Sequence, residues 1–397
     1  MDVLVTGVGI ICALGTTEDE VIASFREHAS GMGAAEHLTT RHRADYTFGE
    51  VKLSNEQLAN LHGLPAHLSR TILLSYHAAR AAHTSIAPEL LKDQRVGFIS
   101  ATSVGGMDKT EAFFEDCAHD ATAGDLRQVL HHDCGKATDF VAERLGIKDF
   151  VTTISTACSS SANALMLGAR MIKAGLLDVV IAGGADPLTR FTFNGFNTLM
   201  IVDRAQCRPL DASREGLNLG EGAAYLVLMR EDLAATAGID AMCRLSGYSN
   251  TNDAFHQTAL SEEGEGPFLA MTQALKSSGL SPADIGYLNM HGTGTMNNDA
   301  AEGTAIRRIF GAAPPKLSST KSFTGHTLAA SGAIEAVLAA NAVKHGFVFP
   351  NFSFSNSVEG LDLTPVQAFH TDPSVRHVLS NSFGFGGNCS SLIFSRT

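Results

Sequence analysis

A single cysteine stands where a nucleophile could lie. Residues 154–175 read ISTACSSSANALMLGARMIKAG, in which an apolar, β-branched approach ends at Cys158 and three serines precede an alanine-rich helix. A helix N-terminus presents unpaired N–H groups and a positive dipole end, and both favour a thiolate. An unpaired cysteine is also a common small core residue. This stretch by itself leaves both interpretations open.

Two histidines stand at comparable positions in the chain. His291 ends an apolar strand in LNMHGTGT, and His326 follows in KSFTGH, five residues after Lys321 and nine before Glu335. Folds of the α/β class place their sites at such switches from strand or loop to helix. Alone, each histidine is more often structural than catalytic. The HHDCG stretch at 131–135 has no companion pair at metal-ligand spacing, so no metal site is predicted.

The elements that would position these residues alternate along the chain. Short apolar segments are separated by glycine turns and alanine-rich helices, which is typical of an α/β or layered α/β/α architecture. Gly7 and Gly9 in the first strand lack the third glycine of a dinucleotide-binding turn, so that function is not favoured. Strands are expected at residues 2–10, 95–103, 178–186, 223–231, 285–293, 377–387 and 389–395.

Two helices of small residues resemble one another. Residues 160–175 and 331–346 each end in Lys-x-Gly, and each follows a polar turn that carries a candidate reactive residue, Cys158 or His326. Small residues permit the close approach of a second helix, so we expect these two helices to pack together centrally. Their N-termini would then point at one site. The similarity suggests an internal duplication.

Composition excludes several classes of function. The chain of 397 residues has a formal net charge of -12, which argues against a surface that binds nucleic acid. Its seven cysteines are scattered without a CxxC pair, which predicts no disulfide framework and fits a reducing cytoplasm. The apolar N-terminal stretch lacks a basic region and is interpreted as a first strand, not a signal peptide. No run approaches the ~18 apolar residues of a membrane span.

Four motifs in this order carry a resemblance to a known family. TACSSSA, HGTGT, KSFTGH and NSFGFGG together resemble the β-ketoacyl-acyl carrier protein synthases, in particular the elongating type with a Cys-His-His triad. The resemblance covers essentially the whole chain. It implies a thiolase-like α/β fold in which two similar halves, residues 1–235 and 236–397, form a five-layered α-β-α-β-α core. It also implies a homodimer whose interface completes the acyl pocket.

The resemblance also implies a role for each motif residue. Cys158 resembles the nucleophile, and His291 and His326 resemble the histidine pair. Lys321 would support the site through hydrogen bonding and charge, and Glu335 would be the carboxylate on the following helix. Asp299 and Glu302 are expected in ion pairs behind the site. Thr293 and Thr295 would place hydroxyls near the malonyl and phosphopantetheine groups, and Phe385 would be the aromatic gate between the cysteine and the malonyl unit.

The implied reaction is a decarboxylative Claisen condensation. An acyl chain first moves from a thioester onto Cys158, which requires a thiolate, and the N–H groups of Cys158 and Phe385 stabilise the oxyanion. Malonyl-acyl carrier protein then loses carbon dioxide, and His291 and His326 donate hydrogen bonds from Nε2 to the enolate oxygen. The carbanion attacks the acyl-Cys158 thioester and releases a 3-oxoacyl product. The scheme needs no metal or organic cofactor, because the carrier protein, which is the implied partner, brings the phosphopantetheine.

Departures from the common pattern leave the pathway open. Cys389 stands where the common synthases usually have asparagine, and the segment 191–228 is shorter than in housekeeping elongation enzymes. This resembles specialised ketosynthases, including those that make aryl polyene pigments, so the starter is either aliphatic or aromatic and the pathway either fatty acid or polyketide synthesis.

Three alternative functions have to be weighed against condensation: a chain-length factor, a CoA thiolase and a scaffolding subunit. A non-condensing chain-length factor of a ketosynthase heterodimer usually lacks the nucleophile, and a CoA thiolase does not show the HGTGT and KSFTGH series. A scaffolding subunit would have no reason to keep four reactive motifs. Condensation is therefore favoured.

Overall fold

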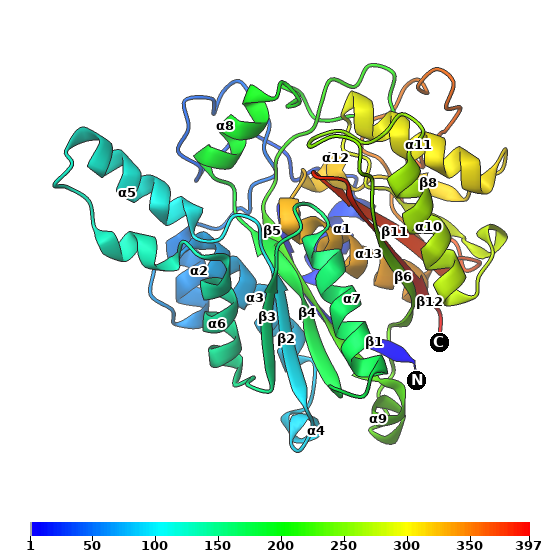
Figure 1. Ribbon diagram of the computed structural model, residues 1–397, viewed down its shortest axis with the longest axis horizontal. Coiled ribbons are helices and arrows are strands. Elements are labelled where there is room, and N and C mark those ends of the chain that lie inside the picture. Colours follow the sequence, from blue (N-terminus) through cyan, green and yellow to red (C-terminus); the bar gives the residue numbers. More distant parts are fainter. Residues whose placement is uncertain (1) are drawn as a thin grey trace.

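The computed structural model describes residues 2–397, which form one large sheet with helices on both faces (Figure 1). Ten strands follow the order β3-β2-β4-β5-β1-β6-β12-β11-β7-β8. Their bounds are β1 Val3–Cys12, β2 Val96–Ala101, β3 Phe150–Ile154, β4 Val179–Asp186, β5 Gly222–Arg230, β6 Cys243–Asn252, β7 Tyr287–Asn289, β8 Lys316–Ser318, β11 His377–Gly384 and β12 Asn388–Ser395.

The two halves of this sheet have the same topology. In the first, β2 pairs in parallel with β3 and β4, and β5 pairs antiparallel with β4 and β1. In the second, β7 pairs in parallel with β8 and β11, and β12 pairs antiparallel with β11 and β6. The halves join at β1 and β6, where Leu4 lies opposite Arg244. The chain is therefore a structural duplication.

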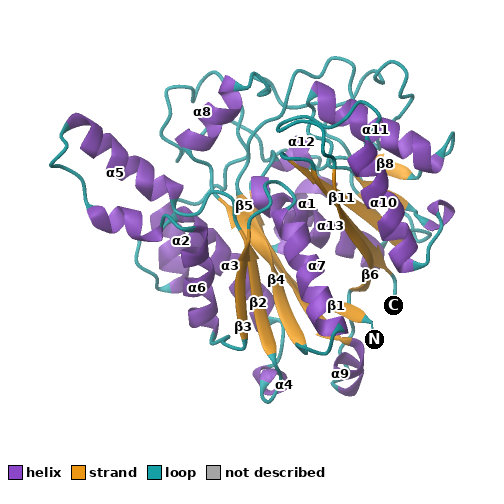
Figure 2. Ribbon diagram, viewed as in Figure 1, coloured by secondary structure: helices purple, strands orange, loops and turns teal. Residues whose placement is uncertain are grey.

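Helices form three layers around the two half-sheets (Figure 2). Helices α3 (Arg70–Thr84) and α6 (Cys134–Leu145) cover the outer face of the first half-sheet, and α10 (Glu265–Ser278) and α11 (Met296–Phe310) cover that of the second. Between the half-sheets lie α7 (Ser160–Lys173) and α13 (Ser331–His345), which share one apolar core with both. The layers therefore follow the order α-β-α-β-α.

The two central helices are the pair with similar sequences. Their first turns lie side by side, because the backbone N–H of Ala333 donates to Ser161 Oγ at 2.8 Å. A Cβ on Gly332 would lie 2.9 Å from the backbone nitrogen of Ala162, so only glycine permits this approach. The prediction that the two helices pack centrally with neighbouring N-termini is confirmed.

The remaining elements surround this core, and α5 with η1 forms an arm that projects from the body at the left of Figure 1. The arm carries the exposed side chains of Phe114, Leu126 and Leu130. The bounds are α1 Glu18–Arg26, α2 Asn55–His62, α4 Pro88–Leu91, α5 Met107–His119, α8 Arg190–Thr198, α9 Glu231–Thr236, α12 Lys321–Thr324, η1 Leu126–His131, η2 Pro282–Asp284, η3 Leu328–Ala330, β9 Phe347–Val348 and β10 His370–Thr371.

Seven strands lie where the sequence predicts them, and five were not predicted. Two of the five, β9 and β10, pair only with each other, and the other three belong to the large sheet. These three are β3, β6 and β8. Gly7 and Gly9 serve packing within β1, since a Cβ on Gly9 would lie 2.1 Å from the carbonyl oxygen of Ala78 in α3. A glycine in this strand therefore allows a helix to approach the sheet closely.

Candidate active site

Cys158 lies in a tight turn between β3 and α7, just before the N-cap residue Ser159. The side chain is buried, with 6% of its surface exposed. The preceding Ala157 has φ +53°, a left-handed conformation that is uncommon outside glycine and is found at functional turns. Ser160 holds this turn, because its Oγ accepts a hydrogen bond from Thr156 N at 2.8 Å. The turn therefore presents the sulfur in a defined direction.

A glycine-rich hairpin lies against this turn and carries Phe385. The hairpin joins β11 to β12, and both Gly386 and Gly387 have positive φ values, +84° and +79°. Burial raises the pKa of the Cys158 thiol, and the neighbouring backbone N–H of Phe385 acts in the opposite direction. The Phe385 ring stacks on Phe196 of α8, with centroids 5.5 Å apart. The hairpin thus supplies both an N–H donor and an aromatic ring beside the nucleophile.

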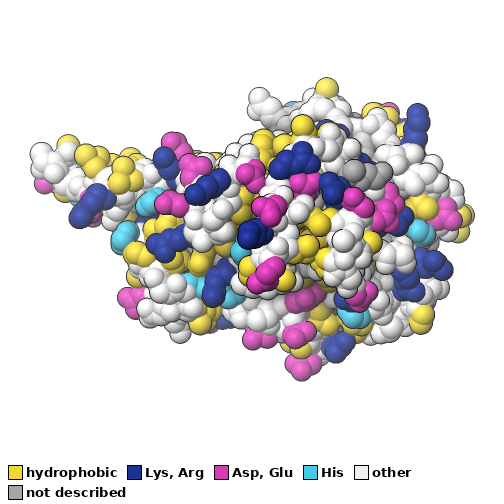
Figure 3. Space-filling view, turned by 90° about the horizontal axis from the view of Figure 1, so that it is seen from below, with side chains coloured by type: hydrophobic (Ala, Val, Ile, Leu, Met, Phe, Trp, Pro, Cys, Tyr) yellow, Lys and Arg dark blue, Asp and Glu magenta, His cyan; other side chains and the backbone are white. Residues whose placement is uncertain are grey.

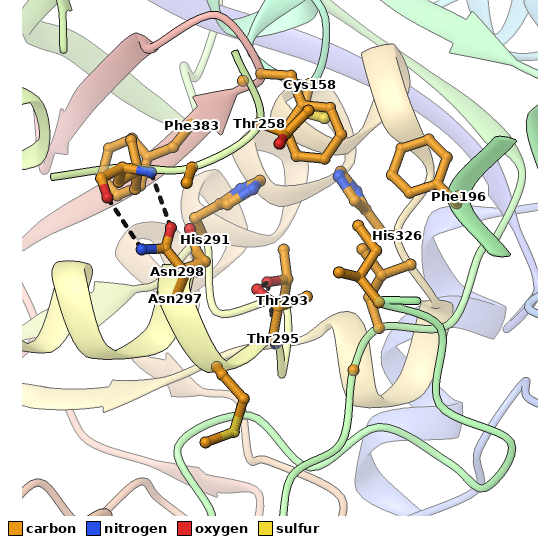
Figure 4. A pocket seen from close by; sticks show the side chains of 18 of the residues that line it. Cys158, Phe196, Thr258, His291, Thr293, Thr295, Asn297, Asn298, His326 and Phe383 are labelled. Carbon is orange, nitrogen blue, oxygen red and sulfur yellow. Dashed lines mark hydrogen bonds between the residues drawn. The ribbon is translucent and has the colours of Figure 1, made fainter. Parts of the chain in front are cut away.

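His291 and His326 come from two different turns and meet beside Cys158. Their ring centroids lie 5.3 Å apart at 85°, and in Figure 4 both rings point into the space beside Cys158. His291 follows β7, and its backbone N–H donates to Glu302 Oε1 at 2.9 Å. His326 Nδ1 lies 2.9 Å from Ser331 Oγ. A hydroxyl donor at Nδ1 leaves the ring proton on Nε2, from which His326 can donate.

These residues line one cavity of about 240 Å³ (Figure 4). Thr293 and Thr295 lie farther from Cys158, and their Oγ1 atoms are 2.9 Å apart. The wall opposite belongs to the segment after β6, which Asn297 fixes through reciprocal hydrogen bonds of 2.8 and 3.0 Å with the backbone of Leu260. The cavity therefore brings together a thiol, two imidazoles and two hydroxyls.

A second cavity, of about 390 Å³, begins on the other side of Phe385. Its walls are mainly apolar and include Val104, Leu199 and Leu328. Cys158 and Phe385 line both cavities. The nucleophile thus lies between the cavity that contains the histidines and a second, apolar cavity, and Phe196 lines both cavities together with Cys158 and Phe385.

Behind the histidines lies a buried ion pair between Lys321 and Glu335. Only 2% of the lysine side chain and 3% of the glutamate side chain are exposed. Asp299 lies 3.8 Å from Arg214 and accepts the backbone N–H of Leu210, at 2.8 Å. Glu302 differs from the expectation, because no ion pair involves it within residues 2–397.

Glu302 orients the first histidine through the backbone. Its two carboxylate oxygens accept the N–H groups of His291 and Gly292, each at 2.9 Å, and Asn381 Nδ2 also donates to it at 2.9 Å. The expectation of an ion pair was wrong for this residue because three neutral donors already satisfy the carboxylate. Its role is to fix the turn that follows β7.

Burial is the largest cause of the pKa shifts of the reactive groups. It raises the pKa of the Cys158 thiol to about 12, although Lys321 and the Phe385 N–H act in the opposite direction. The pKa values of His291 and His326 lie well below the ordinary value, because of burial and then the charge of Lys321. Burial therefore favours a neutral thiol beside neutral imidazoles over the thiolate that a helix N-terminus favours. A neutral imidazole can accept the proton that Cys158 loses as it attacks.

Sequence reasoning missed several residues that hold the site together. Asp186, at the end of β4, accepts hydrogen bonds from Thr102 at 2.5 Å and from the backbone N–H of Ala329 at 2.9 Å, and so links the two halves. Phe196 stacks on Phe385, and Ser331 Oγ lies within hydrogen-bond distance of His326 Nδ1. No local signal marks these residues, because their partners lie far away in the chain. Asp186 alone could have been noted as a charged residue that ends an apolar strand.

Residues 2–397 show no sign of a metal site or a membrane-spanning helix. No group of three His, Cys, Asp or Glu side chains in this part of the chain has an arrangement that could hold a metal ion. No helix there is long and apolar enough to cross a membrane. Acidic and basic side chains are interspersed on the face shown in Figure 3, without a continuous basic area.

Comparisons with known proteins identify the class. Residues 1–234 match the family described as beta-ketoacyl synthase, N-terminal domain, and residues 242–355 match its C-terminal domain. A curated relative is 3-oxoacyl-[acyl-carrier-protein] synthase 2 of Staphylococcus aureus (strain COL), 30% identical over 99% of this chain and 98% of the relative.

Two solved structures show the same fold along the whole chain. The ishigamide ketosynthase/chain length factor aligns with a TM-score of 0.94 at 28% identity, covering 100% of this chain and 99% of that one. The ketosynthase ApeO, in complex with its chain length factor ApeC from Xenorhabdus doucetiae, aligns with a TM-score of 0.85 at 32% identity, covering 100% and 98%.

The fold is thus that of the thiolase-like ketosynthases, as predicted. The chain belongs to the beta-ketoacyl synthase family, and it is an acyltransferase with a ketosynthase-type condensing role.

Proposed function

We propose that the chain is a 3-oxoacyl-[acyl carrier protein] synthase that condenses an acyl thioester with malonyl-acyl carrier protein. The observation that carries this proposal is the convergence of Cys158, His291 and His326 on one cavity, with an apolar space on the other side of the nucleophile. The acyl chain occupies the apolar space, and the malonyl group enters the cavity that contains the histidines.

The two half-reactions use different residues. In the first, the thiol of Cys158 attacks the acyl thioester, and the N–H groups of Cys158 and Phe385 stabilise the oxyanion. In the second, the malonyl group loses carbon dioxide, and the neutral rings of His291 and His326 donate hydrogen bonds to the enolate oxygen. Burial and then the charge of Lys321 keep both rings neutral, since each lowers the pKa of both rings. Thr293 and Thr295 position the phosphopantetheine arm.

No resident cofactor has a role in this proposal, because the nucleophile and every hydrogen-bond donor belong to the chain. The phosphopantetheine arrives on the carrier protein. Solved neighbours that pair a ketosynthase with a chain length factor, at 28% and 32% identity, support a specialised pathway, whereas the curated 3-oxoacyl-[acyl-carrier-protein] synthase 2, at 30% identity, supports fatty acid synthesis. Comparison of aliphatic and aromatic starters as acyl donors decides between the two.

A second thiolase-like chain is the proposed partner, and it would pack against the arm formed by α5 and η1. Phe114, Leu126 and Leu130 of the arm and Phe191 of α8 are exposed in the single chain, and yellow apolar side chains lie along the arm at the left of Figure 3. A second copy or a chain-length factor would cover them and close the apolar cavity. The mass of the protein alone in solution distinguishes these partners, because a homodimer forms without a second gene product.

The proposal is tested by mass spectrometry of the intact protein. Incubation with octanoyl-acyl carrier protein should add one acyl group at Cys158, and addition of malonyl-acyl carrier protein should then release the 3-oxoacyl product. Cys158→Ala is the matched control that should take no acyl group. An unmodified wild-type protein would instead support the non-condensing alternative, a chain-length factor or scaffolding subunit.

A further inference from the structure

The hairpin that carries Phe385 rests on the nucleophile turn at both of its feet. Gly384 and Asn388 lie opposite each other at the base, in register between β11 and β12. At the first foot, a Cβ on Gly384 would lie 2.9 Å from the carbonyl oxygen of Thr156 and 3.2 Å from the backbone nitrogen of Cys158. This foot therefore packs directly against the segment that leads to the nucleophile.

The second foot is held by a single oxygen atom. Asn388 Oδ1 accepts hydrogen bonds from Ser159 Oγ at 2.6 Å, Asn163 Nδ2 at 3.0 Å and Asn250 Nδ2 at 2.7 Å. Ser159 is the residue next to Cys158, Asn163 lies in α7, and Asn250 lies in β6. One carboxamide oxygen thus connects the hairpin to the nucleophile helix and to a neighbouring strand.

We propose that Asn388 is a positioning residue for the acylation of Cys158. Its oxygen fixes the base of the hairpin to Ser159, and this keeps the Phe385 N–H beside the Cys158 sulfur, where the oxyanion forms. The inference rests on the proposed function for the acylation step. Its geometric part, the contact of both feet of the hairpin with the nucleophile turn, does not depend on which thioester the protein uses.

The tip of the hairpin has different contacts, so the base and the tip can act separately. Gly386 N donates to the carbonyl oxygen of Gln257 at 2.8 Å, and Asp253 N donates to that of Gly387 at 2.7 Å. None of these groups bonds to the Asn388 side chain. A movement of the tip that admits the malonyl unit therefore leaves the base, and the oxyanion donor beside it, in place.

The donors that meet at Asn388 would survive its loss. Ser159 Oγ also donates to the Thr156 carbonyl oxygen at 2.8 Å, and Asn163 Nδ2 also donates to Thr156 Oγ1 at 2.8 Å. Asn250 Nδ2 also donates to Ser390 Oγ at 2.9 Å. Because each donor keeps an acceptor, an apolar side chain at position 388 leaves no buried donor unpaired, and the protein should fold. What is lost is the link between the hairpin and Ser159.

The main variant is Asn388→Leu, which keeps the size of the side chain and removes the acceptor. A displaced oxyanion donor costs about 10²-fold in rate when it moves by roughly 1 Å. We expect the rate constant for octanoyl transfer to Cys158 to fall about 10- to 100-fold, while the half-saturating concentration of octanoyl-acyl carrier protein stays unchanged. Alkylation of Cys158 by iodoacetamide should require a higher pH, since the Phe385 N–H no longer stabilises the thiolate.

Two further variants separate positioning from folding. Asn388→Asp keeps an acceptor oxygen, so acylation should recover at high pH, with the alkylation profile displaced upward by the added negative charge. Ser390→Ala is the matched control, because Ser390 is buried in the same network, bonds to Asn163 and Asn250, and makes no hydrogen bond to Asn388. It should acylate at the wild-type rate.

The inference is overturned if folded Asn388→Leu is acylated and alkylated like the wild type, or if Ser390→Ala slows acylation equally. If Asn388→Leu does not fold, Asn388→Ala takes its place, because it removes the same acceptor without adding a larger apolar side chain: slower acylation supports the link, and a wild-type rate refutes it. If the wild type takes no acyl group at all, the proposed function fails, and the alkylation profiles still test the position of the Phe385 donor.

Discussion

Replacement of Lys321 by methionine should destabilise the protein strongly. The ammonium group forms its ion pair with Glu335, and both side chains are almost fully buried. The second carboxylate oxygen, Glu335 Oε2, has no hydrogen-bond partner within residues 2–397. Burial already raises the pKa of Glu335 to about 7, although Lys321 acts against it. Lys321→Met therefore leaves this carboxyl without its only counter-charge.

The magnitude follows from the burial of the pair. Removal of one partner of a buried ion pair costs about 3–5 kcal/mol of the free energy of unfolding. Protonation of Glu335 relieves part of this cost at low pH. A folded-state pKa above the unfolded value means that the folded protein binds more protons, so the stabilisation is lost as pH rises. Loss of the lysine raises the pKa of Glu335 further. Between the wild-type value of about 7 and the higher value in the variant, each pH unit should therefore add about 1.4 kcal/mol to the loss caused by Lys321→Met.

The double variant Lys321→Met/Glu335→Leu separates stability from catalysis. It removes both charges, and such replacements are neutral or stabilising by about 1–4 kcal/mol. Condensation should nevertheless stay lost, because the charge of Lys321 lowers the pKa values of the Cys158 thiol and of both histidines. Stability is measured by urea unfolding, followed by circular dichroism, at pH 6, 7 and 9, which lie around the raised pKa of about 7. Catalysis is measured by acylation and by carbon dioxide release.

Two results would refute this reasoning. Wild-type stability of Lys321→Met across that pH range would show that the lysine does not compensate a buried carboxylate. Recovery of condensation in the double variant would show that Lys321 serves only as a counter-ion for Glu335.

The other predictions concern the reacting groups and one histidine, His62, that lies outside the site. Cys158→Ala should stay folded and lose condensation, as product analysis would show; activity near the wild-type rate would reject the nucleophile. His291→Ala and His326→Ala should each lower malonyl decarboxylation by about 10²–10³-fold and acylation much less, with the two steps measured separately; the reverse pattern would exchange their roles. Phe385→Ala should make carbon dioxide release less dependent on prior acylation, and an unchanged ratio in a folded variant would exclude the gate. Burial lowers the pKa of His62 from 6.5 to about 4, so the folded protein binds fewer protons than the unfolded chain. Stability should therefore fall as the pH drops from 6.5 to about 4. In His62→Gln, the thermal midpoint should decrease less over this pH range.

Local patterns were sufficient to place most strands and to select residues that the fold brings together around one cavity. Cys158, His291, His326 and Lys321 lie in motifs of a few residues each, and seven apolar segments formed strands where expected. The small residues of α7 and α13 also indicated their central packing, because a close helix contact needs small side chains on both partners. The unpredicted β8 is a short strand that its own residues barely mark.

The electrostatics of the site could not be predicted from these motifs. The helix start suggested a thiolate at Cys158, whereas burial raises the pKa of the thiol to about 12. Similarly, Glu302 was expected in an ion pair and instead binds backbone N–H groups. Both differences have one cause: desolvation and hydrogen-bond partners depend on which segments meet in space.

By itself the sequence determined which chemical groups the protein has and which element carries each one. A thiol before a helix, two imidazoles after turns and a glycine-flanked aromatic ring are local properties, because few neighbouring residues define them. Only the tertiary structure decided how they act together. Asn388 and Ser159 are 229 positions apart and still share a hydrogen bond beside the nucleophile. The duplicated sheet and the crossing of α7 with α13 create that contact, and with it the burial that keeps the thiol and both imidazoles neutral.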